Sequence, residues 1–168
     1  MAVGKLRRSD RAMSVEDSIA LLQRALVGRI GTVDPEGTPY VVPLNFVFEE
    51  QPCRIHLHLA KQRGHLASNI RVSPRVCFEV DEPGPLIATG ETACETSHAY
   101  ESVVCFGQAD VVSDERERTR VAGLFVRKYA DEHMPGRSYK PELALLCVVE
   151  IVTVEIEVMT GKRRPPLR

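Results

Sequence analysis

Two histidines in the 168-residue sequence have the type and spacing that chemistry requires. His56 and His58 lie in the segment 54–60, whose alternating and β-branched composition predicts a strand. Side chains alternate along a strand, so both imidazoles would point to one face, where they could move protons or share a metal ion. A metal needs a third and usually a fourth ligand, but Lys61 and Arg63 follow in place of carboxylates. The sequence therefore predicts no metal site and leaves open whether the two histidines are only half-exposed strand residues.

The segment Arg63-Gly64-His65, which follows this strand, has the composition of a phosphate-binding corner. We expect a helix over 61–71, and free N-terminal amides, a glycine and flanking cations together suit a phosphate. Arg29 and Arg71 could add positive charge from neighbouring elements. Neither a P-loop nor a G-x-G-x-x-G turn is present, which argues against the usual nucleoside-triphosphate and dinucleotide folds.

Short β-prone segments separated by turn residues must position these side chains. Strands are predicted over 29–33, 39–48, 54–60, 75–81, 101–112 and 143–159, and helices over 14–28, 61–71 and 114–129. Most strands are joined by hairpins and do not alternate regularly with helices. This order favours a mainly β fold, a closed or nearly closed antiparallel barrel decorated by helices.

Pro43 lies inside the predicted strand 39–48, where proline cannot donate a ladder hydrogen bond. It therefore marks an edge strand, a bulge or a place where the backbone faces a ligand. The sequence leaves these alternatives open.

Composition favours one globular domain, with 43% hydrophobic and 27% charged residues. The balance of 22 Lys and Arg against 23 Asp and Glu argues against general nucleic-acid binding. No apolar run approaches the roughly 20 residues that span a bilayer, no secretory signal begins the chain, and the five cysteines form no C-x-x-C pair. We expect a basic segment over 1–13, a single domain over 14–162 and a tail over 163–168. We also expect a cytoplasmic location, with no membrane or nucleic-acid partner.

Four segments in order resemble a known family. They are Gly28-Arg29-Ile30-Gly31-Thr32-Val33 with Gly37-x-Pro39-Tyr40-Val41-Val42-Pro43-Leu44-Asn45-Phe46; His58-x-Ala60 with Gly64-His65 and Pro74-Arg75-Val76-Cys77-Phe78-Glu79-Val80; Tyr100-Glu101-Ser102-Val103-Val104-x-Phe106-Gly107; and Thr160-Gly161-Lys162. The pattern resembles the pyridoxamine 5′-phosphate oxidase-like FMN-binding split barrels. Within that family it is most similar to the branch of the 5-nitroimidazole-resistance (Nim-type) reductases.

The resemblance implies a six-stranded antiparallel split barrel that forms a homodimer and binds FMN at the subunit interface. The implied FMN contacts are Val42, Pro43, Leu44 and Asn45 beside the ring and ribityl chain, His58, Leu59 and Ala60 at the flavin, Arg63, Gly64 and His65 near the phosphate, Ser102 from the partner subunit, and Lys162. His58 is the implied catalytic residue, since an imidazole near the flavin could donate a proton while the flavin supplies electrons.

The implied function is that of an FMN-dependent oxidoreductase acting on nitro-aromatic or other small electrophilic substrates. The alternatives are a non-enzymatic flavin or haem binding or sensing protein on the same barrel, and a deazaflavin-dependent relative. His65 stands where many relatives have Lys or Arg, and Glu101 stands where the Nim-type pattern has Arg. These two departures predict a weaker or pH-dependent hold on the phosphate.

Overall fold

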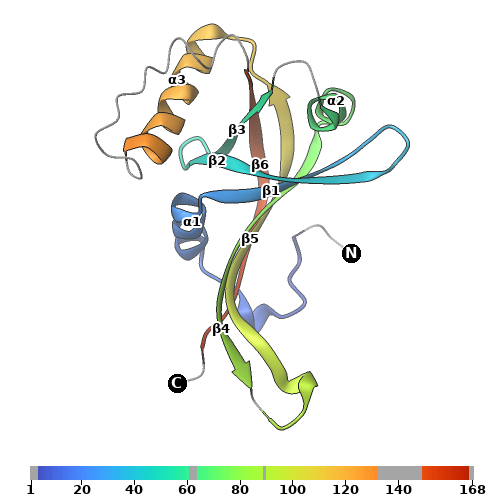
Figure 1. Ribbon diagram of the computed structural model, residues 1–168, viewed down its shortest axis with the longest axis vertical. Coiled ribbons are helices and arrows are strands. Elements are labelled where there is room, and N and C mark those ends of the chain that lie inside the picture. Colours follow the sequence, from blue (N-terminus) through green and yellow to red (C-terminus); the bar gives the residue numbers. More distant parts are fainter. Residues whose placement is uncertain (1–3, 61–63, 89, 132–148, 167–168) are drawn as a thin grey trace.

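The computed structural model describes residues 4–60, 64–88, 90–131 and 149–166. In chain order its elements are η1 (Ser9–Arg11), α1 (Val15–Arg24), β1 (Val27–Val33), β2 (Pro39–Glu49), β3 (Arg54–Ala60), α2 (His65–Val72), β4 (Arg75–Ala88), η2 (Ala93–Glu95), β5 (Thr96–Val111), α3 (Glu115–Phe125), η3 (Val126–Asp131) and β6 (Val149–Arg164). The strands pair antiparallel and close in the order β1-β2-β3-β6-β5-β4. This confirms the predicted mainly β barrel of six antiparallel strands (Figure 1).

The barrel interior is filled by alternate side chains of the strands. Ile30, Phe46 and Phe78 are fully buried there, and the rings of Phe46 and Phe78 meet edge to face with centroids 4.9 Å apart. Leu22 of α1 and Leu66 of α2 pack against the same core. Burying one such side chain stabilises the fold by about 1.5–3 kcal/mol, so the two helices are held mainly by their apolar faces.

Helix α1 begins where the sequence predicts and ends earlier. The Ser14 hydroxyl accepts a hydrogen bond from the Asp17 amide at 3.0 Å, as expected of an N-cap. The predicted end at Gly28 is wrong, because the helix stops at Arg24 and Gly28 belongs to β1. A Cβ at Gly28 would lie 2.1 Å from Cζ of Phe78, so glycine is needed here for close approach of the strand to that ring.

Strands β4 and β5 are longer than predicted and form an arm that extends from the barrel (Figure 1). Their ladder shifts register between Pro83 and Leu86 and then resumes at the pair Leu86 and His98. The two strands were missed over 82–88 and 96–100. Two prolines and a glycine interrupt the alternation in the first segment, and the second, Thr96 to Tyr100, has no apolar alternation on which strand prediction could depend.

Strand β6 continues to Arg164, and the residues 143–148 of its predicted range lie outside the described residues. The N-terminal segment attaches to this strand. Ala12 forms a β-bridge with Lys162, and the amide of Met13 donates to the carbonyl of Gly161 at 3.0 Å. The division of the chain at residues 13 and 162 stays a prediction.

Strand β2 changes its partner at Phe46. Residues 39–45 pair with β1, whereas Phe46 to Glu49 pair with β3. Among the described strands none pairs with the second edge of residues 39–45. The register with β1 runs without a shift from Asn45 to Pro39, so Pro43 lies in an edge segment and not at a bulge.

The Tyr129 hydroxyl lies at this change of partner. It accepts a hydrogen bond from the Phe46 amide at 2.9 Å, and its proton can go to the carbonyl of Leu26 at 2.6 Å or of Phe46 at 2.7 Å. The β1–β2 ladder ends at Val27 and Asn45, so Leu26 and Phe46 are the next residues along each strand. The hydroxyl thus satisfies backbone groups that the ladder leaves unpaired. Burial raises the pKa of Tyr129 to about 12, which keeps the hydroxyl protonated.

We expect Tyr129→Phe to lower the free energy of unfolding by about 1–3 kcal/mol, because it keeps the ring and leaves backbone groups unsatisfied. Urea unfolding measures this loss. Tyr40→Phe, at a side chain on the exposed edge of β2, is the matched control and should change stability by less than about 0.5 kcal/mol. Equal losses in the two variants would contradict the role given to Tyr129.

Candidate functional site: the open edge of β2

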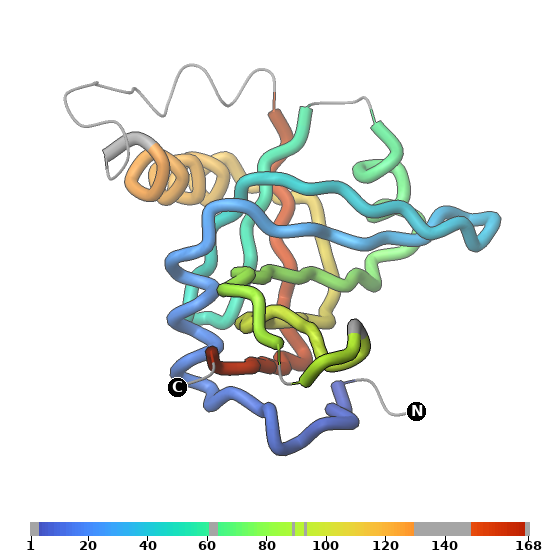
Figure 2. Tube along the Cα trace, turned by 60° about the horizontal axis from the view of Figure 1, so that its bottom comes forward, coloured from blue at the N-terminus to red at the C-terminus, as the bar shows by residue number. Residues whose placement is uncertain are grey.

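The open edge of β2, residues 39–45, lies beside the N-terminus of α2. The ring centroids of Tyr40 and His65 are 5.6 Å apart. Thr32, which pairs with Tyr40 across the β1–β2 ladder, accepts a hydrogen bond from the side chain of Asn69 in α2 at 3.1 Å. Figure 2 shows the β1–β2 hairpin reaching past α2. The structure therefore places Gly64 and His65 beside the Tyr40 end of this edge, whereas Asn45, the last of the predicted contacts on β2, pairs with Val27 at the other end of the ladder.

Gly64 caps α2 in a conformation that favours glycine. Its φ is +145°, and a Cβ built on it would meet nothing within 4 Å. The first amides of a helix have no partner within the helix, and the first turn of α2 carries no acidic residue. An open, glycine-flanked set of backbone donors fits a phosphate. Arg63, the third residue predicted here, lies outside the described residues.

The predicted contacts on β2 and β3 fall into two groups by the direction of their side chains. Val42, Leu44 and Leu59 pack against the barrel core, so only their backbone could meet a cofactor. Pro43 and Asn45 are exposed on the outer face, and Ala60 is exposed at the end of β3. A ligand at this edge would therefore be recognised largely by main-chain groups.

His58 lies on the outer face of β3, one position beyond the last pair that β3 makes with β2. Its ring meets Phe125 of α3 edge to face at 5.0 Å, and Phe125 stacks on Tyr129 at 6.0 Å. The side chain is half-buried, and this burial lowers its pKa below the usual 6.5. At neutral pH His58 is an uncharged imidazole near the open edge, able to give or take a proton.

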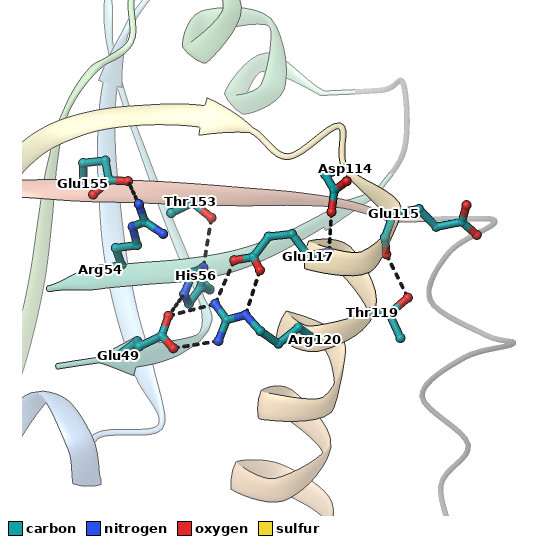
Figure 3. A network of polar contacts seen from close by, with 10 residues as sticks. All are labelled: Glu49, Arg54, His56, Asp114, Glu115, Glu117, Thr119, Arg120, Thr153 and Glu155. Atoms are coloured by element: carbon teal, nitrogen blue, oxygen red, sulfur yellow. Dashed lines mark hydrogen bonds and ion pairs between the residues drawn. The ribbon is translucent and has the colours of Figure 1, made fainter. Parts of the chain in front are cut away.

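His56 points to the same face as His58, as predicted, but it is fully buried and fully engaged (Figure 3). Its Nε2 donates to Glu49 at 3.0 Å, and its Nδ1 accepts from the Thr153 hydroxyl at 2.9 Å. Arg120 of α3 donates to the other oxygen of Glu49 at 2.6 Å. His56 thus joins the barrel to α3 and is not available to a ligand. Over the described residues no three His, Cys, Asp or Glu side chains are arranged to hold a metal ion.

The charges of this network, in which His56 is buried and Arg120 is exposed, are set by their neighbours. Arg120, together with His56, lowers the pKa of Glu49 to about 2. Burial lowers the pKa of His56, although Glu49 acts in the opposite direction. At neutral pH the network therefore holds an ionised carboxylate, a guanidinium and a neutral imidazole.

Arg29 and Arg71 were expected to add charge to the phosphate corner, and this prediction is wrong. Arg29 forms an ion pair with Asp81 and a longer contact of 3.6 Å with Glu79. Arg71 lies in the last turn of α2 and pairs with Glu150 at 2.6 Å. Both guanidiniums are committed to carboxylates, and Arg71 is at the opposite end of the helix from the corner.

Ser102 and Lys162 lie opposite each other on β5 and β6, and the Ser102 hydroxyl donates to the Lys162 carbonyl at 3.4 Å. Ser102 pairs on its other side with Asp81, at the Val27 end of β1, whereas α2 contacts β1 at Thr32. Five residues of strand span about 16 Å. Within one protomer these two residues are therefore separated from the N-terminus of α2.

Glu101 is ion-paired on the α1 side of β5, and its effect on phosphate binding stays a prediction. Neighbouring residues of a strand point to opposite faces, so Glu101 and Ser102 are on different sides of β5. Glu101 accepts from Arg24 of α1, which also donates to Glu82 at 2.9 Å. Its charge is compensated on the α1 side, away from Ser102.

Three aromatic neighbours of the site were not identified as such from the sequence. Tyr40 was part of the motif but was not linked to His65, and Phe125 and Tyr129 were seen only as an apolar helical stripe. The spacing of Phe125 and Tyr129 predicted helix, but nothing local indicated which strand they would meet.

The pKa of His56 is lower in the folded protein than its usual 6.5 in the unfolded chain. Below about pH 6.5 the unfolded state therefore binds more protons than the folded state, and stability should fall as the pH drops. We expect His56→Gln to reduce this pH slope, measured as the free energy of unfolding between pH 7.5 and 5.5, by up to about 1 kcal/mol per pH unit. His58 keeps part of the slope in this variant, since burial lowers its pKa too. The exposed His98→Gln is the control, and equal slopes in the two variants would refute the assignment.

The family profile described as pyridoxamine 5′-phosphate oxidase matches residues 14–163. No curated protein sequence matches the chain. No helix in the described part of the chain is long and apolar enough to cross a membrane.

Several solved structures are similar to this one. A candidate 5-nitroimidazole antibiotic resistance protein from Bacteroides thetaiotaomicron is 24% identical, with a TM-score of 0.73 over 90% of this chain and 86% of that one. A flavocytochrome from Azotobacter vinelandii is 21% identical, with a TM-score of 0.76 over 98% of this chain and 75% of that one. An FAD and haem binding protein from Mycobacterium smegmatis is 20% identical, with a TM-score of 0.69 over 92% and 74%. Together with the family profile, which spans nearly the whole chain, they show that this protein belongs to the pyridoxamine 5′-phosphate oxidase family and has its split-barrel fold.

Proposed function

We propose that this protein is an FMN-dependent oxidoreductase with its cofactor at the open edge of β2. The observation that carries the proposal is the edge of residues 39–45, which no described strand pairs with, beside the Gly64 corner. Free backbone donors and acceptors suit the polar edge of a flavin ring, and the α2 amides suit its phosphate. The family match and the flavin-binding structural neighbours support the same cofactor class.

Bound FMN would supply the electron transfer, while the chain supplies binding, orientation and proton placement. His58 is the proposed catalytic residue. It holds a proton on a neutral imidazole nitrogen, and Phe125 fixes its ring and covers one side of it. Likeness to the candidate 5-nitroimidazole resistance protein supports a nitro-aromatic or other small electrophilic substrate.

The proposal includes a homodimer with FMN at its interface. Ser102 and Lys162 lie too far from the α2 corner to act on it within one protomer, but a second copy could bring them there. Val27, Val33 and Val41 are exposed on one face of β1 and β2, an apolar surface that a partner subunit would cover. A cytoplasmic location, where the four described thiols would stay reduced, completes the proposal.

The absorbance spectrum of the purified protein, followed by titration with FMN, tests the cofactor directly. We expect one FMN per chain, and His65→Lys should tighten binding several-fold at pH 8, because it adds a permanent positive charge beside the helix amides. His98→Lys, on the distant arm, is the matched control and should leave the affinity unchanged. A wild-type protein that ignores FMN at saturating concentration would overturn the proposal.

Haem binding is the second candidate, because His58 is a half-buried neutral imidazole and two similar structures are a flavocytochrome and an FAD and haem binding protein. If the protein binds haem through this residue, added haemin should produce a Soret band that His58→Ala abolishes and His98→Ala keeps. A band that survives in His58→Ala excludes His58 as the ligand, and no band in wild type excludes haem.

A further inference from the structure

A cluster of cations and hydroxyls lies on the outer face of β5 and β6, away from the open edge of β2. We call it the Tyr100 cluster; its members are Arg11, Tyr100, Ser102, Lys162 and Arg164. The β5–β6 register places Tyr100 opposite Arg164 and Ser102 opposite Lys162. Alternate residues share a face, so all four strand side chains lie on the same side. The Lys162 ammonium is 5.8 Å from the centroid of the Tyr100 ring.

The fifth member, Arg11, is supplied by the N-terminal segment. The bridge between Ala12 and Lys162 fixes the residue next to Arg11 against β6. The charged side chains of Arg11 and Lys162 lie near the Tyr100 hydroxyl. Burial alone would raise the pKa of Tyr100, but these two cations lower it below its usual value.

The carboxylates closest to the cluster in the chain are engaged elsewhere. Asp10 pairs with Arg8 at 2.6 Å, and Asp17 pairs with Arg163 at 3.0 Å. Glu101 lies on the opposite face of β5, in an ion pair with Arg24. The cluster therefore combines three cations with two hydroxyls and has a local excess of positive charge, which is the donor set that binds phosphate oxygens.

A cavity of about 460 Å³ adjoins the cluster and shares two of its residues, Tyr100 and Arg164. Its other walls include the prolines of β4 and of the chain after β6: Pro83, Pro85, Pro165 and Pro166. The carboxylates of Glu82 and Glu101 also line it and are ion-paired with Arg24, and Arg163 lines it and is paired with Asp17. This volume is within the range of small-molecule sites. An aromatic ring and prolines suit a flat organic group, and Tyr100 and Arg164 belong to both the cavity lining and the cluster.

We propose that the Tyr100 cluster and this cavity form a binding site for a phosphate ester of a planar aromatic group, such as a nucleoside phosphate. The cluster takes the phosphate and the cavity takes the planar group. Arg11 is the residue that selects for phosphate, because it is the guanidinium that the N-terminal segment brings to the Tyr100 hydroxyl.

Calorimetric titration with AMP, adenosine and inorganic phosphate tests the site in the full-length protein. We expect AMP to bind more tightly than either part alone. Arg11→Gln should weaken AMP binding about tenfold or more and leave adenosine binding unchanged. Arg7→Gln, at an exposed cation of the same segment, is the control and should bind AMP as wild type does. Absence of AMP binding, or equal affinities in the two variants, would overturn the proposal.

Tyrosinate absorbance gives a second readout that does not depend on folding of an arginine variant. A phosphate at the cluster competes for the cations that lower the pKa of Tyr100, so AMP should raise the pKa of the tyrosine whose signal Tyr100→Phe removes. An unchanged titration in saturating AMP would contradict direct contact at this residue.

Parallel titrations with FMN and riboflavin identify the source of the phosphate. If Arg11→Gln weakens FMN binding and spares riboflavin, the cluster holds the phosphate of the flavin. If FMN binding is insensitive and AMP binding is lost, the cluster is a separate nucleotide site. If the protein binds AMP but no flavin, this inference is supported and the proposed function is overturned. If it binds flavin but no AMP, the proposed function is supported and this inference is overturned.

Discussion

The change of partner of β2 at Phe46 is the constraint on which the candidate site depends. A strand has two hydrogen-bonding edges. In β2, residues 39–45 pair with β1 through one edge, and Phe46 to Glu49 pair with β3 through the other. Each half is left with an open edge. At the edge that begins at Phe46, the Tyr129 hydroxyl satisfies the backbone amide of Phe46. The edge of residues 39–45 stays open beside α2. The opening that could admit a cofactor is therefore a direct result of strand pairing.

Helix α3 connects this opening to the polar network. Arg120, Glu49 and His56 hold the first half of the helix on the sheet, so the chain that follows reaches the barrel at a defined place. There Phe125 packs against His58 and Tyr129 meets the backbone of Phe46. The Arg120 side chain is 41% exposed, and ion pairs of this kind contribute only about 0–1 kcal/mol each. The network thus fixes the position of α3 more than it strengthens the fold.

The outer face of the barrel has two chemically different ends. At the Val27 end of β1, the neighbouring strands β4, β5 and β6 carry Ser102 and the cations around Tyr100. At the Thr32 end, β1 contacts α2, which begins at the Gly64 corner. Glu101 and Ser102 are neighbours on β5, so their side chains point to opposite faces of the strand. The charge of Glu101 is compensated by Arg24 on the face opposite Ser102.

The sequence alone determined what depends on neighbours along the chain. The helices predicted to begin at residues 14 and 114 do begin there, with Ser14 and Asp114 as their N-caps. Strand β3 has its predicted bounds, and Pro43 had to lie at an edge, at a bulge or facing a ligand. Only the tertiary structure decided which of these Pro43 marks, that His56 is buried while His58 is not, and that Arg29 and Arg71 are paired. The physical reason is separation along the chain: Tyr129 and Phe46 are 83 positions apart, and Arg24 and Glu101 are 77 apart. No local period or propensity encodes such contacts, because they form only when the barrel closes and brings distant segments together.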